Sequence, residues 1–295
     1  MKVIRVETEG TRGRAALELS LRRLVRGFKP DVAVTLGPSL GGLGCPIVEL
    51  VASDEESERE RGALASIRGR VRAARRKESS CIVPTSASIE LLPQDRRALV
   101  CPPGIDTQRF SSGTHQKDDL RAVFVGRLVA SRGAHLALEA FNGLPQWARS
   151  SAHLDLVGTA TDRRYLETLR RKAKGLPCTI HTDVADVLPF LQRASLALMP
   201  HTSEDGWGRG ILECMAAGLP VVTSKGEVLR SVTGGQVEFV PAGNLKALGE
   251  RLRQLLRSEP RRTELGAAAR EHVLTKNSWE TVLPVWEQAL EKAAR

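Results

Sequence analysis

The stretch "EDGWGRGILECMAAGLPVV" (204–222) decides the fold of this chain. It places a loop of acids and glycines in front of a short apolar helix, whose first turn we expect at 209–212, and a strand follows at 220–224. Glycines at a helix start let a ligand approach the free N–H groups of the first turn, which favours an anion. Carboxylates suit hydroxyl groups instead, and each charge-assisted bond of this kind contributes about 1.5–3 kcal/mol. The stretch therefore indicates a site that binds both an anion and sugar hydroxyls.

Two acids of this stretch, Asp205 and Glu213, have seven residues between them. In one interpretation Asp205 precedes the helix, Glu213 lies about one turn inside it, and both face one cleft. In the other, Glu204 or Asp205 is the N-terminal cap and Glu213 is solvated. The small residues Ala216 and Ala217 permit tight packing of the helix, which favours the first interpretation and a buried Glu213.

Short apolar runs alternate with helical patterns along the whole chain, which is typical of parallel α/β units. The polar stretch 106–119 has no periodicity and predicts a linker between two Rossmann-like domains, with ligands at the carboxyl ends of their strands. Strands are expected at 2–6, 31–36, 46–51, 80–86, 97–105, 122–128, 153–158, 178–183, 196–200, 220–224 and 237–240, and helices at 15–28, 56–77, 134–144, 162–175, 185–194, 244–257, 261–274 and 279–294.

A second candidate site follows the strand at 122–128. Gly126 and Arg127 end this strand, and Arg132 precedes the glycine that opens the next helix. Two guanidinium groups at the mouth of a strand form a fork that suits a diphosphate. Two surface arginines beside a turn are the other interpretation of the same pattern, and the pattern alone does not decide between them.

Taken together, these motifs resemble the GT-B glycosyltransferases of family 4, also known as glycosyl transferases group 1. The family pattern is roughly GRL-x3-KG followed by E-G-F-G-x3-LEAMA-x-G-x-PVV, and the chain has "GRLVASRG" (126–133) and then the opening stretch. "CPPGIDTQRF" (101–110) resembles the segment that ends the family's first domain, and "NSWE" (277–280) resembles its late S-W motif. The resemblance covers 97–290 and implies two Rossmann-like domains that face a central cleft.

The resemblance also implies roles for individual residues. Arg127 and Arg132, the latter in place of the usual lysine, would bind the donor diphosphate. Glu213 would hold the ribose hydroxyls, and Asp205 would contact the donor sugar with a side chain one methylene shorter than the usual Glu, with Glu204 beside it. Gly206, Trp207 and Gly208 would form a backbone cradle, and Gly158 would lie in the loop beside the nucleobase. Gly126 and Arg209 are further donor-binding candidates.

The reaction implied is retaining glycosyl transfer from a UDP-sugar or GDP-sugar to a glycan, a lipid-linked or a small-molecule acceptor. Preorganised cations would stabilise the leaving diphosphate without a metal or a cofactor, and the chain has no Asp-x-Asp motif. A donor-binding subunit or degenerate homologue is the alternative, and an epimerase or a phosphorylase has less support.

The domains predicted are 1–110, on the acceptor side, 111–278, on the donor side, and a closing helix at 279–295 that packs back toward the first domain. The first domain is shorter than the family's, and it aligns either with a degenerate first glycine loop at "EGTRG" (9–13) or with the first two units missing. A homo-oligomer or hetero-oligomer would then complete it.

Composition sets the remaining expectations. The net charge is +10, and the run Arg68–Lys77 either binds an anionic membrane surface or is a solvated face balanced by nearby glutamates. Aromatic residues make up only 4%, which argues against nucleic acid as a partner. The cysteines number five and form no CxxC pair, so neither a disulfide framework nor a zinc site is indicated. No apolar run reaches the roughly 20 residues of a membrane span, and we expect a cytoplasmic protein, peripheral on the membrane at most.

Overall fold

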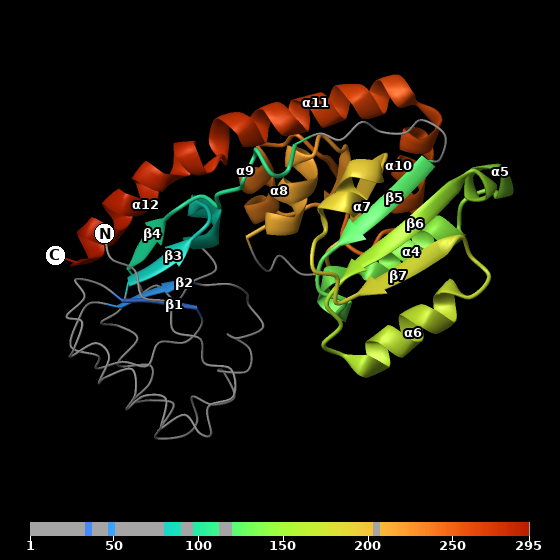
Figure 1. Ribbon diagram of the computed structural model, residues 1–295, viewed down its shortest axis with the longest axis horizontal. Coiled ribbons are helices and arrows are strands. Elements are labelled where there is room, and N and C mark those ends of the chain that lie inside the picture. Colours follow the sequence, from blue (N-terminus) through green and yellow to red (C-terminus); the bar gives the residue numbers. More distant parts are fainter. Residues whose placement is uncertain are drawn as a thin grey trace. The chain divides into compact units, whose positions relative to one another are not determined.

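The computed structural model describes most of the second half of the chain and short pieces of the first (Figure 1). The described residues are 33–36, 47–50, 80–89, 97–111, 120–202 and 207–294. The chain divides into two compact units, one of residues Met1–Cys101 with Val285–Arg295, and the other of Pro102–Pro284. The division at Cys101 comes earlier in the chain than the linker predicted from the sequence.

Unit 1 contains a sheet of four parallel strands in the order β1-β2-β3-β4. Each strand lies within a run predicted from the sequence, and the buried Val48 and Ile82 are apolar residues of β2 and β3. The elements are β1 (Ala33–Leu36), β2 (Ile47–Leu50), β3 (Ser80–Val83), the 3-10 turn η1 (Ser86–Ile89) and β4 (Ala98–Val100). The strand and helices predicted at 2–6, 15–28 and 56–77 lie outside the described residues.

Unit 2 contains a sheet of six parallel strands in the order β10-β9-β8-β5-β6-β7. β8 and β9 are buried along their whole length, which explains why the sequence of β8 is a continuous apolar run rather than an alternating one. The strands are β5 (Leu120–Val125), β6 (Ala152–Gly158), β7 (Cys178–Thr182), β8 (Leu196–Met199), β9 (Val221–Ser224) and β10 (Glu238–Val240).

Helices cover both faces of this sheet (Figure 1). The chain passes from β5 to β6 and β7 on one side of the sheet, and then returns to β8, β9 and β10 on the other side. Because such crossovers are right-handed, the helices of the two halves lie on opposite faces. One face carries α4, α5, α6 and α10, and the other carries α7, α8, α9 and α11. The helices are α4 (Ala134–Asn142), α5 (Gln146–Ser150), α6 (Arg163–Ala173), α7 (Leu188–Arg193), α8 (Arg209–Ala216), α9 (Glu227–Thr233), α10 (Leu245–Arg257), α11 (Glu259–Lys276) and α12 (Trp279–Ala294).

The two short motifs at the ends of unit 2 meet each other. The Ile105 N–H donates to the Asn277 carbonyl at 2.7 Å, and the Asn277 side chain donates to the Pro103 carbonyl at 3.1 Å. The Trp279 ring lies so close to Gly104 that a Cβ there would be 2.4 Å from it. "CPPGIDTQRF" and "NSWE" therefore form one structural element, which fixes where the chain enters and leaves unit 2.

Candidate functional site

The carboxyl ends of β5 and β6 form the floor of the candidate site. The Gly126 N–H donates to the Val157 carbonyl at 3.0 Å, and the Leu128 N–H donates to the Thr159 carbonyl at 2.8 Å. A Cβ on Gly158 would lie 1.7 Å from the Gly126 carbonyl oxygen. Gly158 is therefore required for the close approach of two backbone segments, and its role beside a nucleobase stays a prediction.

The predicted diphosphate fork lies directly after β5. Arg127 is exposed, whereas Arg132 is half-buried at the end of a 3-10 turn, η2 (Ala130–Arg132). Gly133 follows with a left-handed φ of 75°, and a Cβ on it would lie 1.6 Å from the carbonyl oxygen of Pro200. This contact ties the Arg132 loop to the end of β8, so both arginines are held at the carboxyl edge of the sheet.

The first turn of α8 rests on the same edge. Its cap position is occupied by Gly208, with a φ of 64° and no side-chain hydrogen bond, so the alternative in which Glu204 or Asp205 is the N-cap is wrong. A Cβ on Gly210 would lie 3.2 Å from the Val125 carbonyl oxygen. The structure therefore brings together the end of β5, where Gly126 and Arg127 lie, and the N–H groups that open α8.

Glu213 lies inside α8 and is only 8% exposed, so the alternative of a solvated Glu213 is also wrong. The Arg209 Nε donates to its Oε1 at 3.0 Å. Burial raises the pKa of the Glu213 carboxyl above its ordinary value, and the charge and hydrogen bond of Arg209 lower it in part. Among the described residues this carboxylate accepts one hydrogen bond, which leaves lone pairs to accept hydroxyl groups.

Two residues near Glu213 were not among the sequence candidates. Arg109 donates to Asp186 Oδ1 at 2.9 Å, and both side chains act electrostatically on Glu213. Asp186 also accepts the Leu188 N–H at 3.0 Å, and these hydrogen bonds, with the Arg109 charge, lower its pKa. An Asp placed just before a helix is a capping signal and could have been found in the sequence, but the pairing with Arg109 could not.

Part of the predicted site lies outside the described residues, namely Glu204, Asp205 and Gly206. Trp207, which follows them, is half-buried. The contact of Asp205 with the donor sugar therefore stays a prediction. The same holds for the basic run at 68–77, whose residues also lie outside the described ranges.

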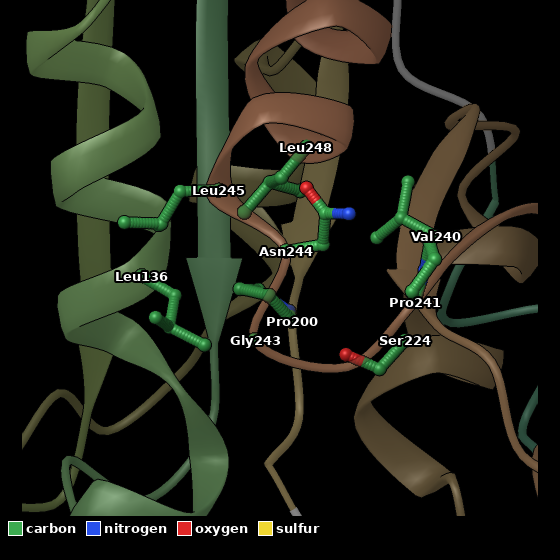
Figure 2. Close-up of a pocket in the computed structure, with 9 residues that line it drawn as sticks. All are labelled: Leu136, Pro200, Ser224, Val240, Pro241, Gly243, Asn244, Leu245 and Leu248. Carbon is green, nitrogen blue, oxygen red and sulfur yellow. The ribbon is translucent and has the colours of Figure 1, made fainter.

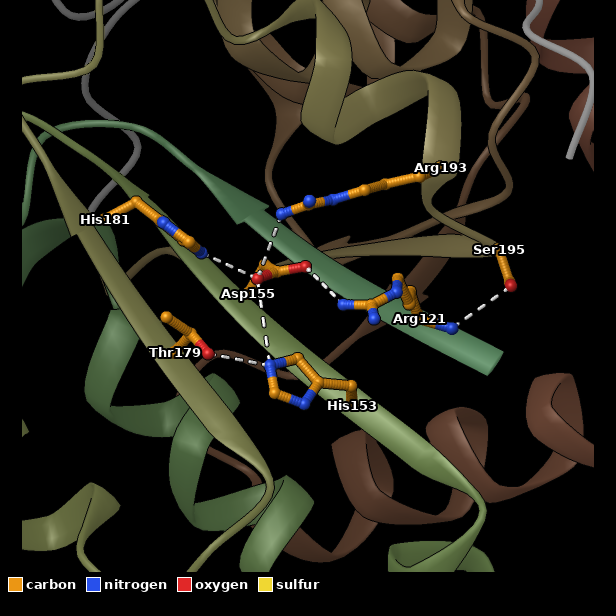
Figure 3. A network of polar contacts seen from close by, with 7 residues as sticks. All are labelled: Arg121, His153, Asp155, Thr179, His181, Arg193 and Ser195. Carbon is orange, nitrogen blue, oxygen red and sulfur yellow. Dashed lines mark hydrogen bonds and ion pairs between the residues drawn. The ribbon is translucent and has the colours of Figure 1, made fainter. Parts of the chain in front are cut away.

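A second polar cluster surrounds Asp155 in the middle of β6 (Figure 3). Its side chain is 3% exposed, and Oδ1 lies 2.8 Å from His181 Nε2. Asp155 belongs to the face of the sheet that α7 covers, because Arg193 of α7 lies 3.4 Å from its Oδ1, and it is not at the carboxyl edge of the sheet. The cluster consists of Arg121, His153, Asp155, Thr179, His181, Arg193 and Ser195. The cluster stabilises the buried charge of Asp155. In the sequence, an aspartate inside the apolar run "HLDLVG" (153–158) indicates such a buried charge.

A shallow hollow, partly open to solvent, lies between α4, the ends of β8, β9 and β10, and the start of α10 (Figure 2). Its lining is largely apolar, and the Ser224 Oγ faces it without a hydrogen-bond partner among the described residues. None of the predicted donor-binding residues that the structure describes lines it. The lining residues are Leu136, Pro200, Ser224, Val240, Pro241, Gly243, Asn244, Leu245 and Leu248.

Within the described ranges, no three His, Cys, Asp or Glu side chains are grouped as metal ligands. In the same ranges, no helix combines the length and the apolarity that crossing a bilayer requires.

A family model described as "Glycosyl transferases group 1" matches residues 105–272. The chain belongs to this family. The match covers the structural elements that build the candidate site, from the segment that carries Arg109 to α11.

Similarity to individual members of the family extends over part of the chain. The chain is 30% identical over 204 residues to the GDP-mannose-dependent monoacylated alpha-(1-6)-phosphatidylinositol monomannoside mannosyltransferase of Corynebacterium glutamicum. The match covers 61% of this chain and 52% of that protein, so the chain spans about half the length of the curated relatives it matches.

Solved structures show the fold. A structure of Anabaena Alr3699/HepE in complex with UDP and glucose has a TM-score of 0.77 at 15% identity, covering 94% of this chain and 81% of that one. Sucrose-phosphate synthase from Thermosynechococcus elongatus has a TM-score of 0.75 at 19% identity, covering 96% and 80%. The predicted fold class, GT-B with Rossmann-like α/β domains, is confirmed.

Proposed function

We propose that the chain is a glycosyltransferase that takes a sugar from a nucleotide-diphosphate donor, and that the donor binds at the carboxyl edge of the sheet in unit 2. One observation carries the proposal: α8 rests on the end of β5, which brings the first-turn N–H groups of α8, the Arg127–Arg132 loop and the buried Glu213 to the same edge. Cations and N–H groups suit the diphosphate, and a buried carboxylate suits the ribose hydroxyls.

Each group has a defined part in the proposed reaction. Negative charge develops on the diphosphate as the bond to the sugar breaks, and fixed cations at Arg127 and Arg132 stabilise that charge more than they stabilise the ground state. The first turn of α8 adds N–H groups, because its N-cap residue, Gly208, has no side chain that could bond them. Asp205 would contact the sugar. We further propose that the transfer retains the configuration at the anomeric carbon and needs no metal.

The relatives suggest which donor and acceptor to test first. The Corynebacterium glutamicum protein is named as GDP-mannose-dependent and as acting on a phosphatidylinositol monomannoside. We therefore propose GDP-mannose as the first candidate donor and a lipid-linked glycan as the first candidate acceptor, with a membrane-peripheral location. The solved complex of HepE with UDP keeps UDP-sugars as the second class of donor.

A thermal-shift panel of nucleotide sugars tests the proposal, followed by mass spectrometry for released or transferred sugar. We expect GDP-mannose or a UDP-sugar to raise the melting temperature, since a ligand at 100 times its Kd stabilises the folded state by about 2.7 kcal/mol. Glu213→Ala should reduce the shift sharply. Glu250→Ala is the matched control, because Glu250 is an exposed glutamate of α10, on the other face of the sheet.

The outcomes separate the candidate functions. A shift accompanied by released or transferred sugar supports an active glycosyltransferase. A shift that depends on Glu213 but gives neither product supports a donor-binding protein that needs a partner chain. The absence of a shift with every nucleotide sugar, in a correctly folded sample, contradicts both.

A further inference from the structure

The ion pair inside the first turns of α8 is unusually asymmetric. The Arg209 Nε and the Glu213 Oε1 are 3.0 Å apart, and the arginine side chain is 78% exposed whereas the glutamate side chain is 11% exposed. A surface pair of this spacing contributes little to stability, because two long side chains must be ordered in water. Here one partner is buried, so the exposed guanidinium acts on a carboxylate that water solvates poorly.

Charged groups from other elements also face Glu213. Arg109 comes from the segment after β4, and Asp186 comes from the loop between β7 and α7. Their charges act on Glu213 in opposite directions, and the two side chains pair with each other at 2.9 Å. Their effects on the pKa of the carboxyl have opposite signs, and Arg209 is its direct hydrogen-bonded counter-ion.

We propose that Arg209 is a positioning residue that keeps the Glu213 carboxylate ionised and fixed in one orientation, ready to accept the ribose hydroxyls of the donor. This inference rests on the proposed function, in which Glu213 holds the ribose. An ionised carboxylate offers both oxygens as acceptors, whereas a protonated one presents an O–H donor on one side and loses the charge-assisted bonds.

The protonation balance at Glu213 explains why such a residue is needed. Burial is the largest effect on this carboxyl and raises its pKa, while Arg209 is the largest opposing influence. Without Arg209, the largest influence that opposes burial is removed, and the acid binds a proton at higher pH. Donor binding would then weaken as the pH falls, although the nucleotide sugar itself does not titrate, because both of its phosphates are esterified.

The first experiment measures Glu213 without any nucleotide. A ¹³C NMR titration of the glutamate carboxyl groups is compared between the unmodified protein and Arg209→Leu, and Glu213→Gln identifies the resonance. We expect the Glu213 midpoint to rise in Arg209→Leu and to stay near its original value in Arg209→Lys. Arg170→Leu is the matched control, since Arg170 is an exposed arginine of α6 on the opposite face of the sheet. An identical midpoint in the unmodified protein and Arg209→Leu overturns the proposal.

The second experiment measures the affinity for GDP-mannose and UDP-glucose by calorimetry across the pH range of that titration. Arg209→Leu should bind like the unmodified protein above its new midpoint and at least tenfold more weakly below it. A loss that is the same at every pH overturns the proposal and assigns Arg209 to direct contact with the diphosphate. If the unmodified protein binds neither donor, the proposed function fails, and the NMR midpoint still decides whether Arg209 keeps Glu213 ionised.

Discussion

Gly133 offers a sharp test of how the Arg132 loop is held. Its φ of 75° lies in the left-handed region, which costs an alanine about 1–2 kcal/mol relative to glycine. The new Cβ would also lie 1.6 Å from the Pro200 carbonyl oxygen, where real contacts begin near 3 Å. Backbone shifts of this size cost roughly 1–3 kcal/mol more. Gly133→Ala should therefore lower the free energy of unfolding by about 2–5 kcal/mol.

The assay is urea unfolding followed by circular dichroism, with thermal melting as a second measure. A loss of this size lowers the melting temperature by roughly 4–20 °C in a domain of about this length. Gly143→Ala is the matched control at the other end of α4, because Gly143 has a φ of −73° and a Cβ on it would lie 3.5 Å from the nearest atom, the Glu139 carbonyl oxygen. Equal stability of the two variants would refute the reasoning that the Arg132 loop is tied to Pro200.

Three further changes have directions that follow from the structure. Burial raises the pKa of Glu213 above its ordinary 4.5, so the ionised acid destabilises the fold at neutral pH. Glu213→Gln should therefore raise the melting temperature at pH 7, and this gain should disappear below pH 4.5. Asp155→Asn should lower the free energy of unfolding by about 1–3 kcal/mol, whereas the same change at Asp162, the N-cap of α6, should have little effect in urea titrations. Burial raises the pKa of Cys101 to about 11 and of Cys178 to about 12, so mass spectrometry should find both unmodified by iodoacetamide in the native protein and modified in urea.

Most elements of unit 2 could be predicted from the sequence because their signals are local. The apolar runs of β5 to β10 and the helical periodicity of α4, α6 and α10 each lie within a few residues of the expected bounds. The first residues of α11 and α7 differ from the expected ones, because capping residues set where these helices begin. α11 begins at Glu259, before the expected 261, because Ser258 accepts the Arg261 N–H and a proline occupies the first turn. α7 begins at Leu188, after the expected 185, and Asp186 accepts its N–H.

Two short helices were missed because they carry too few apolar residues in a repeating pattern. α5 has five residues and follows Pro145, and α9 has seven and ends at Gly234 in the left-handed conformation. A short segment of this kind is helical through its packing and caps rather than through its own propensity.

The residues of the candidate site were predictable one by one, but their interactions were only partly so. Arg209 and Glu213 are four residues apart on one helix, a spacing at which side chains meet. Arg109 and Asp186 are 77 residues apart, so only the folded chain shows that they pair near Glu213. The same limit applies to Gly158 and Gly126, whose contact depends on the register of β5 and β6.

The most direct test of the account asks whether Glu213 binds the ribose. Calorimetry would compare GDP with its 2′,3′-dideoxy counterpart, and UDP with its own, on the unmodified protein and on Glu213→Ala. For the nucleotide that binds, removing the hydroxyls should weaken binding to the unmodified protein by about 10- to 150-fold, the equivalent of 1.5–3 kcal/mol. On Glu213→Ala the dideoxy nucleotide should bind no more weakly than the normal one. Equal losses on both proteins would contradict the account, because the hydroxyls would then be bound elsewhere.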